Sequence, residues 1–213
     1  HVFAGSVVPE PMAEPGRGGI MGRLTADSLA KVLAALELRH DDVLVDSGGG
    51  NGAGLGAAHV LAPTVRLAGV EADPGLVEAA RRNLGALHAV ADLTHAAVQD
   101  TPHLGGATVA YCFSEGLKDA GRVGDAAAAV LAACRATPTL RLIVLVHDAH
   151  RKRHPSVAFA NRERAVGRAS DFPVRMSGGR ETFRCWVVRV ERADAAGLAD
   201  AAAEAAGAAE GAE

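Results

Sequence analysis

The sequence contains little cysteine and no long apolar run. Its three cysteines, Cys112, Cys134 and Cys185, form no CxxC pair, which argues against a disulfide framework and against a zinc ribbon. A reducing, intracellular compartment is therefore expected. No apolar stretch approaches the roughly 18 residues that span a bilayer, so no membrane segment is expected. The chain begins at His1 rather than Met, which is compatible with the removal of a targeting peptide.

Aromatic residues and positive charge are also scarce. Aromatics make up 3% of the chain, so the core is expected to consist mainly of Ala, Val and Leu. The net charge of −3 argues against a generally basic nucleic-acid binder, although it is compatible with a local basic patch. With 213 residues and 49% hydrophobic residues, the chain can form one large domain with a sizeable core.

Strand and helix patterns alternate along the middle of the chain. This alternation is typical of a parallel sheet that is covered by helices on both faces. A terminal pair of strands around a Gly-Gly turn predicts a β-hairpin. The predicted fold class is therefore α/β, a doubly wound Rossmann-like sheet of about seven strands with the last strand antiparallel. The predicted strands are 43–46, 67–71, 87–91, 107–113, 140–147, 172–176 and 182–190, and the predicted helices are 25–38, 53–62, 74–84 and 125–134.

The two ends of the chain have a different composition. Residues 1–19 hold three prolines and four glycines and predict an irregular lead-in. Residues 192–213 are rich in alanine and acidic residues and predict a frayed helix or disorder. The folded domain is expected over residues 20–191.

A glycine-rich loop follows the first predicted strand, in VLVDSGGGNGAG. Asp46, Gly48, Gly50 and Gly52 fill the pattern D-x-G-x-G-x-G without a mismatch. Glycines allow positive φ and close approach of the backbone to a ligand, and the following helix offers free N–H groups. The dinucleotide pattern G-x-G-x-x-G fits only loosely here. An acid at the strand end would repel a pyrophosphate but attract an ammonium group, and S-adenosylmethionine carries an ammonium group and no phosphate.

Two further acids are predicted at strand ends. Glu71 ends the second strand, where a carboxylate can accept both hydroxyls of a ribose; NAD-binding folds place an acid there too, so Glu71 alone does not discriminate. Asp92 is predicted at the end of the third strand, where it could accept from an adenine amino group. The alternatives are a solvated strand end for Glu71 and a helix cap for Asp92.

In this order, VLVDSGGGNG, GVEADP and Asp92 resemble the class I S-adenosylmethionine-dependent methyltransferases over roughly residues 20–190. The resemblance implies S-adenosylmethionine as cofactor, with Asp46 and the loop glycines around its methionine end, Glu71 on the ribose and Asp92 near adenine. The antiparallel terminal strand also fits this family.

A narrower similarity links residues 18–54 to the histone lysine methyltransferases of the disruptor-of-telomeric-silencing kind. In that family a Tyr-Gly-Glu-Leu-like loop stands where this chain has Met21-Gly22-Arg23-Leu24. The family also has an Asn-rich stretch after its fourth strand, which this chain lacks. The similarity therefore concerns the scaffold, with a protein substrate as one option.

The methyl acceptor is expected at the carboxyl ends of the fourth and fifth strands, around YCFSEGL and HDAHRKRH. The Asn/Asp-Pro-Pro-aromatic motif is absent, which argues against methylation of exocyclic base amines. Ser114, Glu115 and His147 are the candidate catalytic residues, which would position or deprotonate the acceptor. Glu115 could instead be an acid at a helix N-terminus.

The loop after the fifth strand is basic. Arg151, Lys152 and Arg153 predict contact with an acidic or phosphorylated substrate, a protein or an RNA; a solvated loop is the alternative. His147, His150 and His154 have a spacing compatible with a metal site, but the neighbouring cations argue against one.

Three functions are compatible with these features. The first is methyl transfer from S-adenosylmethionine to a protein side chain or an RNA. The second is a catalytically inactive, methyltransferase-like structural or assembly subunit of a larger complex. The third is an NAD-dependent oxidoreductase, against which the lack of a Tyr-x-x-x-Lys pair argues.

Overall fold

The computed structural model describes residues 24–101, 104–113, 118–119, 122–123, 125–148, 155–165, 167–176 and 182–190. The predicted lead-in 1–19 and tail 192–213 lie outside these ranges. The elements are α1 (Ala26–Ala35), β1 (Val43–Ser47), α2 (Ala53–Leu61), β2 (Arg66–Glu71), α3 (Pro74–Ala86), β3 (Ala91–His95), the 3-10 helix η1 (Val98–Asp100), β4 (Val109–Phe113), β5 (Lys118–Asp119), β6 (Arg122–Val123), α4 (Asp125–Ala136), β7 (Leu142–Asp148), α5 (Pro155–Ala165), β8 (Ala169–Arg175) and β9 (Thr182–Arg189).

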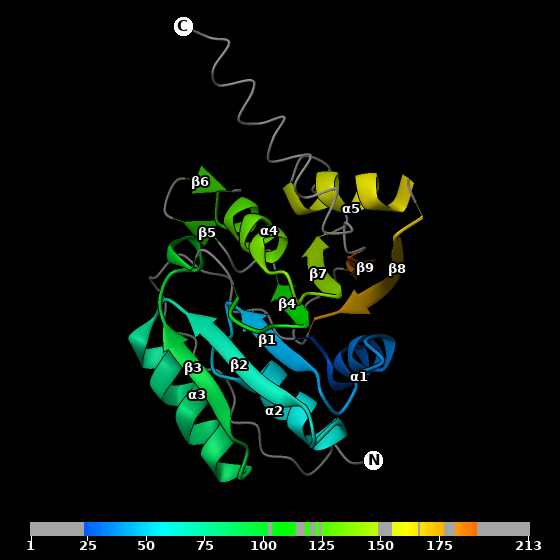
Figure 1. The fold of residues 1–213 in the computed structure, drawn as a ribbon. Coiled ribbons are helices and arrows are strands. Elements are labelled where there is room, and N and C mark those ends of the chain that lie inside the picture. Colours follow the sequence, from blue (N-terminus) through cyan, green and yellow to red (C-terminus); the bar gives the residue numbers. More distant parts are fainter. Residues whose placement is uncertain are drawn as a thin grey trace, which may run out of the picture.

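A seven-stranded sheet forms the centre of the molecule, in the order β3-β2-β1-β4-β7-β9-β8 (Figure 1). Strands β1, β2, β3, β4 and β7 are parallel, and β9 runs antiparallel to both of its neighbours. The predicted sheet of about seven strands with an antiparallel last strand is therefore confirmed. The chain reverses its direction of progress between β1 and β4, and ligands of doubly wound folds bind at such a switch point.

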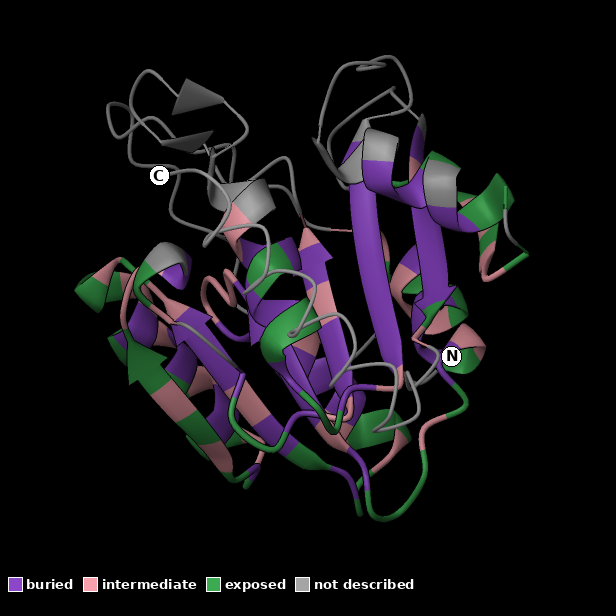
Figure 2. Ribbon diagram, turned by 45° about the horizontal axis from the view of Figure 1, so that its top comes forward, coloured by how far each residue is buried: buried purple, intermediate pink, exposed green. Residues whose placement is uncertain are grey.

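Alternating side chains of the strands build two apolar layers, one on each face of the sheet. Leu44 and Val144 contribute to the layer under α1 and α2, whereas Val45 and Leu145 contribute to the layer under α4 and α5. Buried residues accordingly dominate the central strands in Figure 2. The core is mainly aliphatic, as the composition predicts.

Local signals set the helix starts. Thr25 caps α1, because its side chain accepts a hydrogen bond from the Ser28 N–H. Asp73 caps α3 through the N–H groups of Gly75 and Leu76, with Pro74 in the first turn.

Two predictions about elements are corrected. The third strand was expected at 87–91, but Leu87 caps α3, His88 has a positive φ of 53°, and Val90 is 87% exposed. The strand begins at Ala91 because 91–95 is the stretch that pairs with β2. Helix α5 was not expected, since PSVAFANRERA has no regular apolar stripe; it packs through Phe159 and Ala160 instead.

Within the described ranges, no helix combines the length and the apolarity needed to cross a bilayer. All three cysteines are free and buried.

Candidate functional site

The glycine loop joins β1 to α2 at the carboxyl edge of the sheet. Gly48, Gly50 and Gly52 all have positive φ, of 90°, 53° and 79°. Residues with a Cβ rarely adopt this conformation, so the glycines of the D-x-G-x-G-x-G pattern stand where the backbone requires them. The Gly48 N–H donates to the Val70 carbonyl at 2.8 Å, which anchors the start of the loop to β2.

The loop is packed on one side and open on the other. A Cβ on Gly52 would lie 3.1 Å from the Cβ of Ala80, so the loop is pressed against α3 there. Asn83 of α3 also donates from Nδ2 to the Asn51 carbonyl at 2.9 Å. At Gly50, by contrast, a Cβ would meet nothing within 4 Å. The loop therefore offers bare backbone to a ligand at Gly50.

Glu71 ends β2 and is bonded to this loop. One carboxylate oxygen accepts the Gly50 N–H and the other accepts the Asp73 N–H, both at 2.9 Å. A carboxylate has about four acceptor positions, so acceptor capacity remains for a ligand. A depression of about 220 Å³, which includes open solvent, lies between Gly50, Glu71 and Thr94.

Asp46 lies on the other side of the loop and is 5% exposed. Its carboxyl group sits beneath the first turn of α2, since a Cβ on Gly54 would come within 2.8 Å of Oδ2. Burial, and then the charge of Glu71, raise the pKa of Asp46 from 3.8 to about 7. A cation beside Asp46 would oppose both effects and favour the carboxylate. A second depression, of about 260 Å³ including open solvent, is lined by Asp46, Gly54, Tyr111 and leucines of the α1 region, β1 and α2.

Asp92 is not at the carboxyl edge. It is the second residue of β3, pairs with Ala68 and is exposed, and the end of the strand is His95, opposite Glu71. The His95 ring is bonded to the Ala72 carbonyl through Nε2 at 3.1 Å. The misplaced strand boundary carried Asp92 to the wrong position, and its location does not support contact with an adenine held beside Glu71.

His147 is 2% exposed, and its ring stacks on Trp186 with the centroids 6.0 Å apart. This places it in the apolar layer beneath α5 rather than on an acceptor surface. Cys112 is likewise buried, which raises the pKa of its thiol well above the usual range and disfavours a nucleophilic thiolate.

The other predicted site residues, Ser114, Glu115, Arg151, Lys152 and Arg153, lie outside the described residues. The structure therefore brings together Asp46, the three glycines and Glu71, and separates Asp92 and His147 from them. Among the residues that can be described, no group of three or more His, Cys, Asp or Glu side chains could hold a metal ion.

Sequence reasoning missed three residues of the site. The Asp73 N–H donates a hydrogen bond to Glu71, and the Asp-Pro pair at the start of a helix could have indicated that Asp73 caps it. Asn83 and Tyr111 gave no signal, because they reach the loop from 32 residues away and from a neighbouring strand.

No protein-family model matches the sequence. No curated protein matches it either. Solved structures do match its fold. A protein from Pyrococcus horikoshii assigned as an RNA methyltransferase has a TM-score of 0.63 and 14% identity, over 87% of this chain and 95% of that one.

Two further structures agree with this match. Precorrin-6y C5,15-methyltransferase from Geobacter metallireducens has a TM-score of 0.55 and 19% identity, over 79% of this chain and 92% of that one. The 23S rRNA methyltransferase ErmE has a TM-score of 0.56 and 14% identity, over 79% of this chain and 69% of that one. The chain thus has the Rossmann-like fold of the class I S-adenosylmethionine-dependent methyltransferases, as the sequence motifs indicated.

Proposed function

We propose that the chain binds S-adenosylmethionine at the Asp46–Gly52 loop and transfers its methyl group to an acceptor. The observation that carries the proposal is the bond between Glu71 and Gly50, which joins the acid at the end of β2 to the positive-φ glycine loop. When bound, the cofactor supplies an electrophilic methyl group on a sulfonium, and the protein supplies position and electrostatics.

The described residues fit such a ligand. Glu71 has unused acceptor capacity for the ribose hydroxyls, and the N–H bonds from Gly50 and Asp73 fix its orientation. Gly50 leaves space where a side chain would obstruct the nucleoside. Asp46 is a buried acid whose charge an ammonium group would compensate.

Binding measurements test this proposal. Calorimetric titration with S-adenosylhomocysteine should give saturable binding, and titration with NAD should give none. Glu71→Ala removes the acceptor oxygens and should weaken S-adenosylhomocysteine binding by about tenfold or more, in line with the loss of charged hydrogen bonds. Glu78→Ala is the matched control, because Glu78 is an exposed acid of α3 that pairs with Arg81 one turn away.

Either of two results would contradict the proposal: binding of NAD alone, or unchanged affinity after Glu71→Ala. Thermal unfolding of each variant shows whether the fold is kept, so a lost fold is not mistaken for a lost site.

A second candidate is the catalytically inactive, methyltransferase-like subunit. It is favoured by the positions of Asp92 and His147, neither of which stands where a cofactor or acceptor contact requires it. The protein would then bind S-adenosylhomocysteine weakly or not at all and transfer no methyl group to cell protein or RNA fractions. Incorporation of label from methyl-labelled S-adenosylmethionine into such fractions decides between the two.

A further inference from the structure

The end of the sheet that carries α5, β8 and β9 has a charge opposite to that of the glycine-loop half. Its described ranges, 155–165, 167–176 and 182–190, contain six arginines, no lysine and two acids, a formal charge of +4. Residues 24–101, which include the glycine loop, contain five basic and ten acidic residues, a formal charge of −5. The net charge of the whole chain conceals this separation.

Three of the arginines lie on one face of the sheet. Arg164 of α5 pairs with Asp171 of β8 at 3.3 Å, and Arg184 of β9 pairs with the same carboxylate. Side chains alternate along a strand, so Arg175 shares the face of Asp171. Arg184 stands opposite Pro173, between Asp171 and Arg175. We call Arg164, Arg175 and Arg184 the arginine face.

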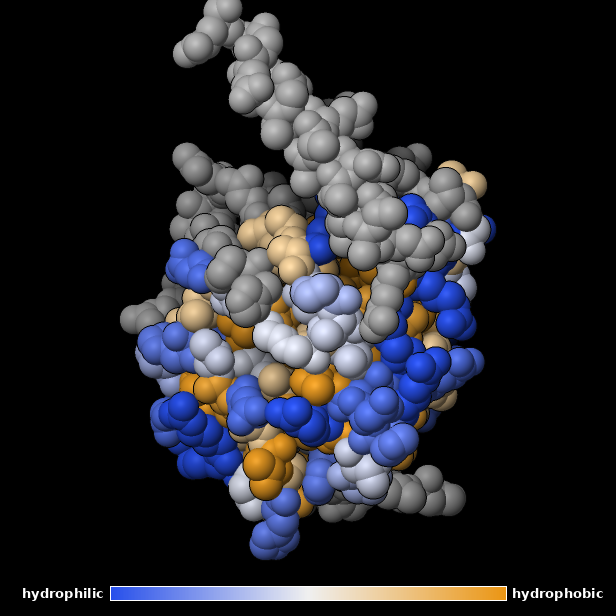
Figure 3. Space-filling model, in the orientation of Figure 1, coloured by the Kyte–Doolittle hydropathy of each residue, from blue (hydrophilic) through white to orange (hydrophobic). Residues whose placement is uncertain are grey.

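The arginine face keeps an excess of positive charge. One carboxylate, Asp171, is shared between Arg164 and Arg184, so it cannot neutralise both. Arg175 is exposed and forms no ion pair with the part of the chain that the structure describes. The side chain of Arg164 is 61% exposed and that of Arg184 is 34% exposed, so both can reach a ligand. In Figure 3 hydrophilic residues lie on both sides of the molecule, over α3 on the left and over α1 and β8 on the right.

The arginine face adjoins the edge at which the proposed chemistry occurs. Arg184 pairs with His147 near the carboxyl end of β7, and Arg175 is the last residue of β8. Strand spacings of about 4.8 Å place β9, with Arg184, roughly 15 Å from β1, and β8, with Arg175, roughly 20 Å from it. A ligand anchored there can extend a reactive group to the loop.

We infer that the arginine face binds the sugar-phosphate backbone of a single-stranded nucleic acid, which is the methyl acceptor of the proposed reaction. Arginine presents a planar fork of donors that matches phosphate oxygens, and every cation in these ranges is an arginine. A basic cluster on one face is the electrostatic footprint of nucleic-acid binding. The acidic half repels the same ligand and directs it to the β7–β9 end.

The backbone-binding part of this inference stands apart from cofactor binding, whereas the role as acceptor rests on the proposed function. The experiment measures binding of a mixed-sequence, 12-nucleotide single-stranded RNA by fluorescence anisotropy between 50 and 200 mM salt. Three phosphate contacts predict a slope of log affinity against log salt of about −2, since each contact contributes about −0.7 on single strands.

The test variant is Arg164→Gln combined with Arg175→Gln, because Asp171 keeps Arg184 as its partner. The salt dependence should become shallower, with a slope of about −0.7 instead of about −2. Affinity at 50 mM salt should fall by about tenfold or more. Arg82→Gln is the matched control; Arg82 is an exposed arginine of α3 in the acidic half, and its loss should leave RNA affinity unchanged or slightly higher.

Two further arms identify the ligand. A DNA strand of the same sequence shows whether the ribose 2′-OH contributes, and either order of affinity supports backbone binding. Polyglutamate of equal charge tests an acidic protein partner. The inference is overturned if polyglutamate binds as tightly as RNA, or if the double variant keeps the affinity and slope of the unchanged protein. S-adenosylhomocysteine affinity, measured on the same variants, separates this failure from a failure of the proposed function.

Discussion

Two buried aspartates stand at opposite ends of β1, and their surroundings differ. Asp42 immediately precedes the strand at the amino edge of the sheet, and Asp46 is its penultimate residue at the carboxyl edge. Asp42 is 2% exposed and Asp46 5% exposed. Burial raises the pKa of both carboxyl groups, but the net result is about 2 for Asp42 and about 7 for Asp46.

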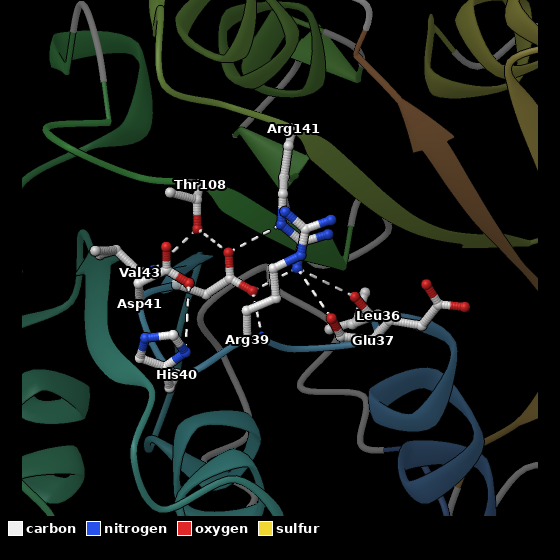
Figure 4. A network of polar contacts seen from close by, with 9 residues as sticks. Leu36, Glu37, Arg39, His40, Asp41, Val43, Thr108 and Arg141 are labelled. Atoms are coloured by element: carbon white, nitrogen blue, oxygen red, sulfur yellow. Dashed lines mark hydrogen bonds and ion pairs between the residues drawn. The ribbon is translucent and has the colours of Figure 1, made fainter.

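The surroundings of Asp42 satisfy its charge (Figure 4). Oδ1 accepts from Thr108 Oγ1 at 2.6 Å and from Arg141 Nε at 2.9 Å, and Oδ2 accepts the Arg39 N–H at 2.7 Å. Arg141 also donates to Oδ2 and to the last carbonyls of the α1 region, those of Leu36 and Glu37. These bonds more than offset burial, so the pKa of Asp42 falls.

Asp46 has no cation within ion-pair distance among the described residues, and the charge that acts on it, that of Glu71, is also negative. One strand therefore serves two purposes. Its amino end joins α1, β4 and β7 through a satisfied network, which stabilises the fold. Its carboxyl end retains an uncompensated acid beside an open backbone loop, which is typical of a functional site.

The largest expected effect is on stability at the amino edge. Asp42→Asn leaves the Arg141 guanidinium without its counter-charge and should lower the free energy of unfolding by about 3 kcal/mol. Urea unfolding at pH 7 measures it. Asp41→Asn is the control, because Asp41 is 73% exposed and its loss should change stability by less than about 0.5 kcal/mol. Equal losses for both variants would show that the network contributes nothing specific.

The effect of Asp42→Asn on stability should also depend on pH. The folded pKa of Asp42 is below its unfolded value, so its contribution is complete above about pH 4 and is lost as the pH falls towards 2. The stability difference between the unchanged protein and Asp42→Asn should therefore shrink over that range. A difference independent of pH would contradict the ionised network.

The next effect concerns ligand binding at the carboxyl edge. Below its pKa of about 7, Asp46 is protonated and must release a proton to pair with an ammonium group. S-adenosylhomocysteine affinity should therefore rise by about tenfold per pH unit up to pH 7 and then level off. Besides burial, Glu71 is the ionisable group that raises the pKa of Asp46. Calorimetry in two buffers of different ionisation enthalpy measures the proton released.

Methylthioadenosine is the matched ligand for this measurement, because it lacks the ammonium group. Its affinity should change little between pH 5.5 and 8.5, and Asp46→Asn should remove the pH dependence of S-adenosylhomocysteine binding. Parallel pH profiles for both ligands would show that Asp46 does not face the ammonium group.

The smallest effect concerns the glycine loop. Gly52→Ala introduces a Cβ 3.1 Å from Ala80 at a φ of 79° and should lower the free energy of unfolding by about 2 kcal/mol. Gly50→Ala has the backbone strain without the contact and should lose only about 1 kcal/mol, yet it should weaken nucleoside binding because it fills the open space. Gly85→Ala should instead stabilise the protein slightly, because Gly85 is an exposed position of α3 and alanine favours the helix. Urea unfolding ranks the three variants by free energy of unfolding. A larger loss for Gly50→Ala than for Gly52→Ala would contradict the packing of Gly52 against Ala80.

The fold and the conformation of the glycine loop were largely predictable, for local reasons. Alternating strand and helix patterns identified the parallel sheet, and the three loop glycines occupy the positive-φ positions. The β3 boundary was not predictable, since LHAVADLTH lacks a clear alternation and pairing with β2 decided its register. This single error moved Asp92 to a strand end that it does not occupy.

Two further features depend on partners that are remote in sequence. The position of β9 between β7 and β8 follows from its pairing with β7, and the hairpin sequence does not specify that partner strand. His147 was predicted to be a catalytic residue at the acceptor site, at the carboxyl end of a strand, but Trp186, 39 residues later, stacks on it.

The sequence alone determined the elements whose conformation is local: the positive-φ glycines, the caps at Thr25 and Asp73, and the periodic strands and helices. Only the tertiary structure decided why Asp42 is satisfied, why Asp46 is not, and why Arg164 and Arg184 share one carboxylate. The physical reason is range, because backbone preference acts over a few residues. Ionisation and charge clustering depend on groups that folding brings together from as far as 99 residues away, as it does for Asp42 and Arg141.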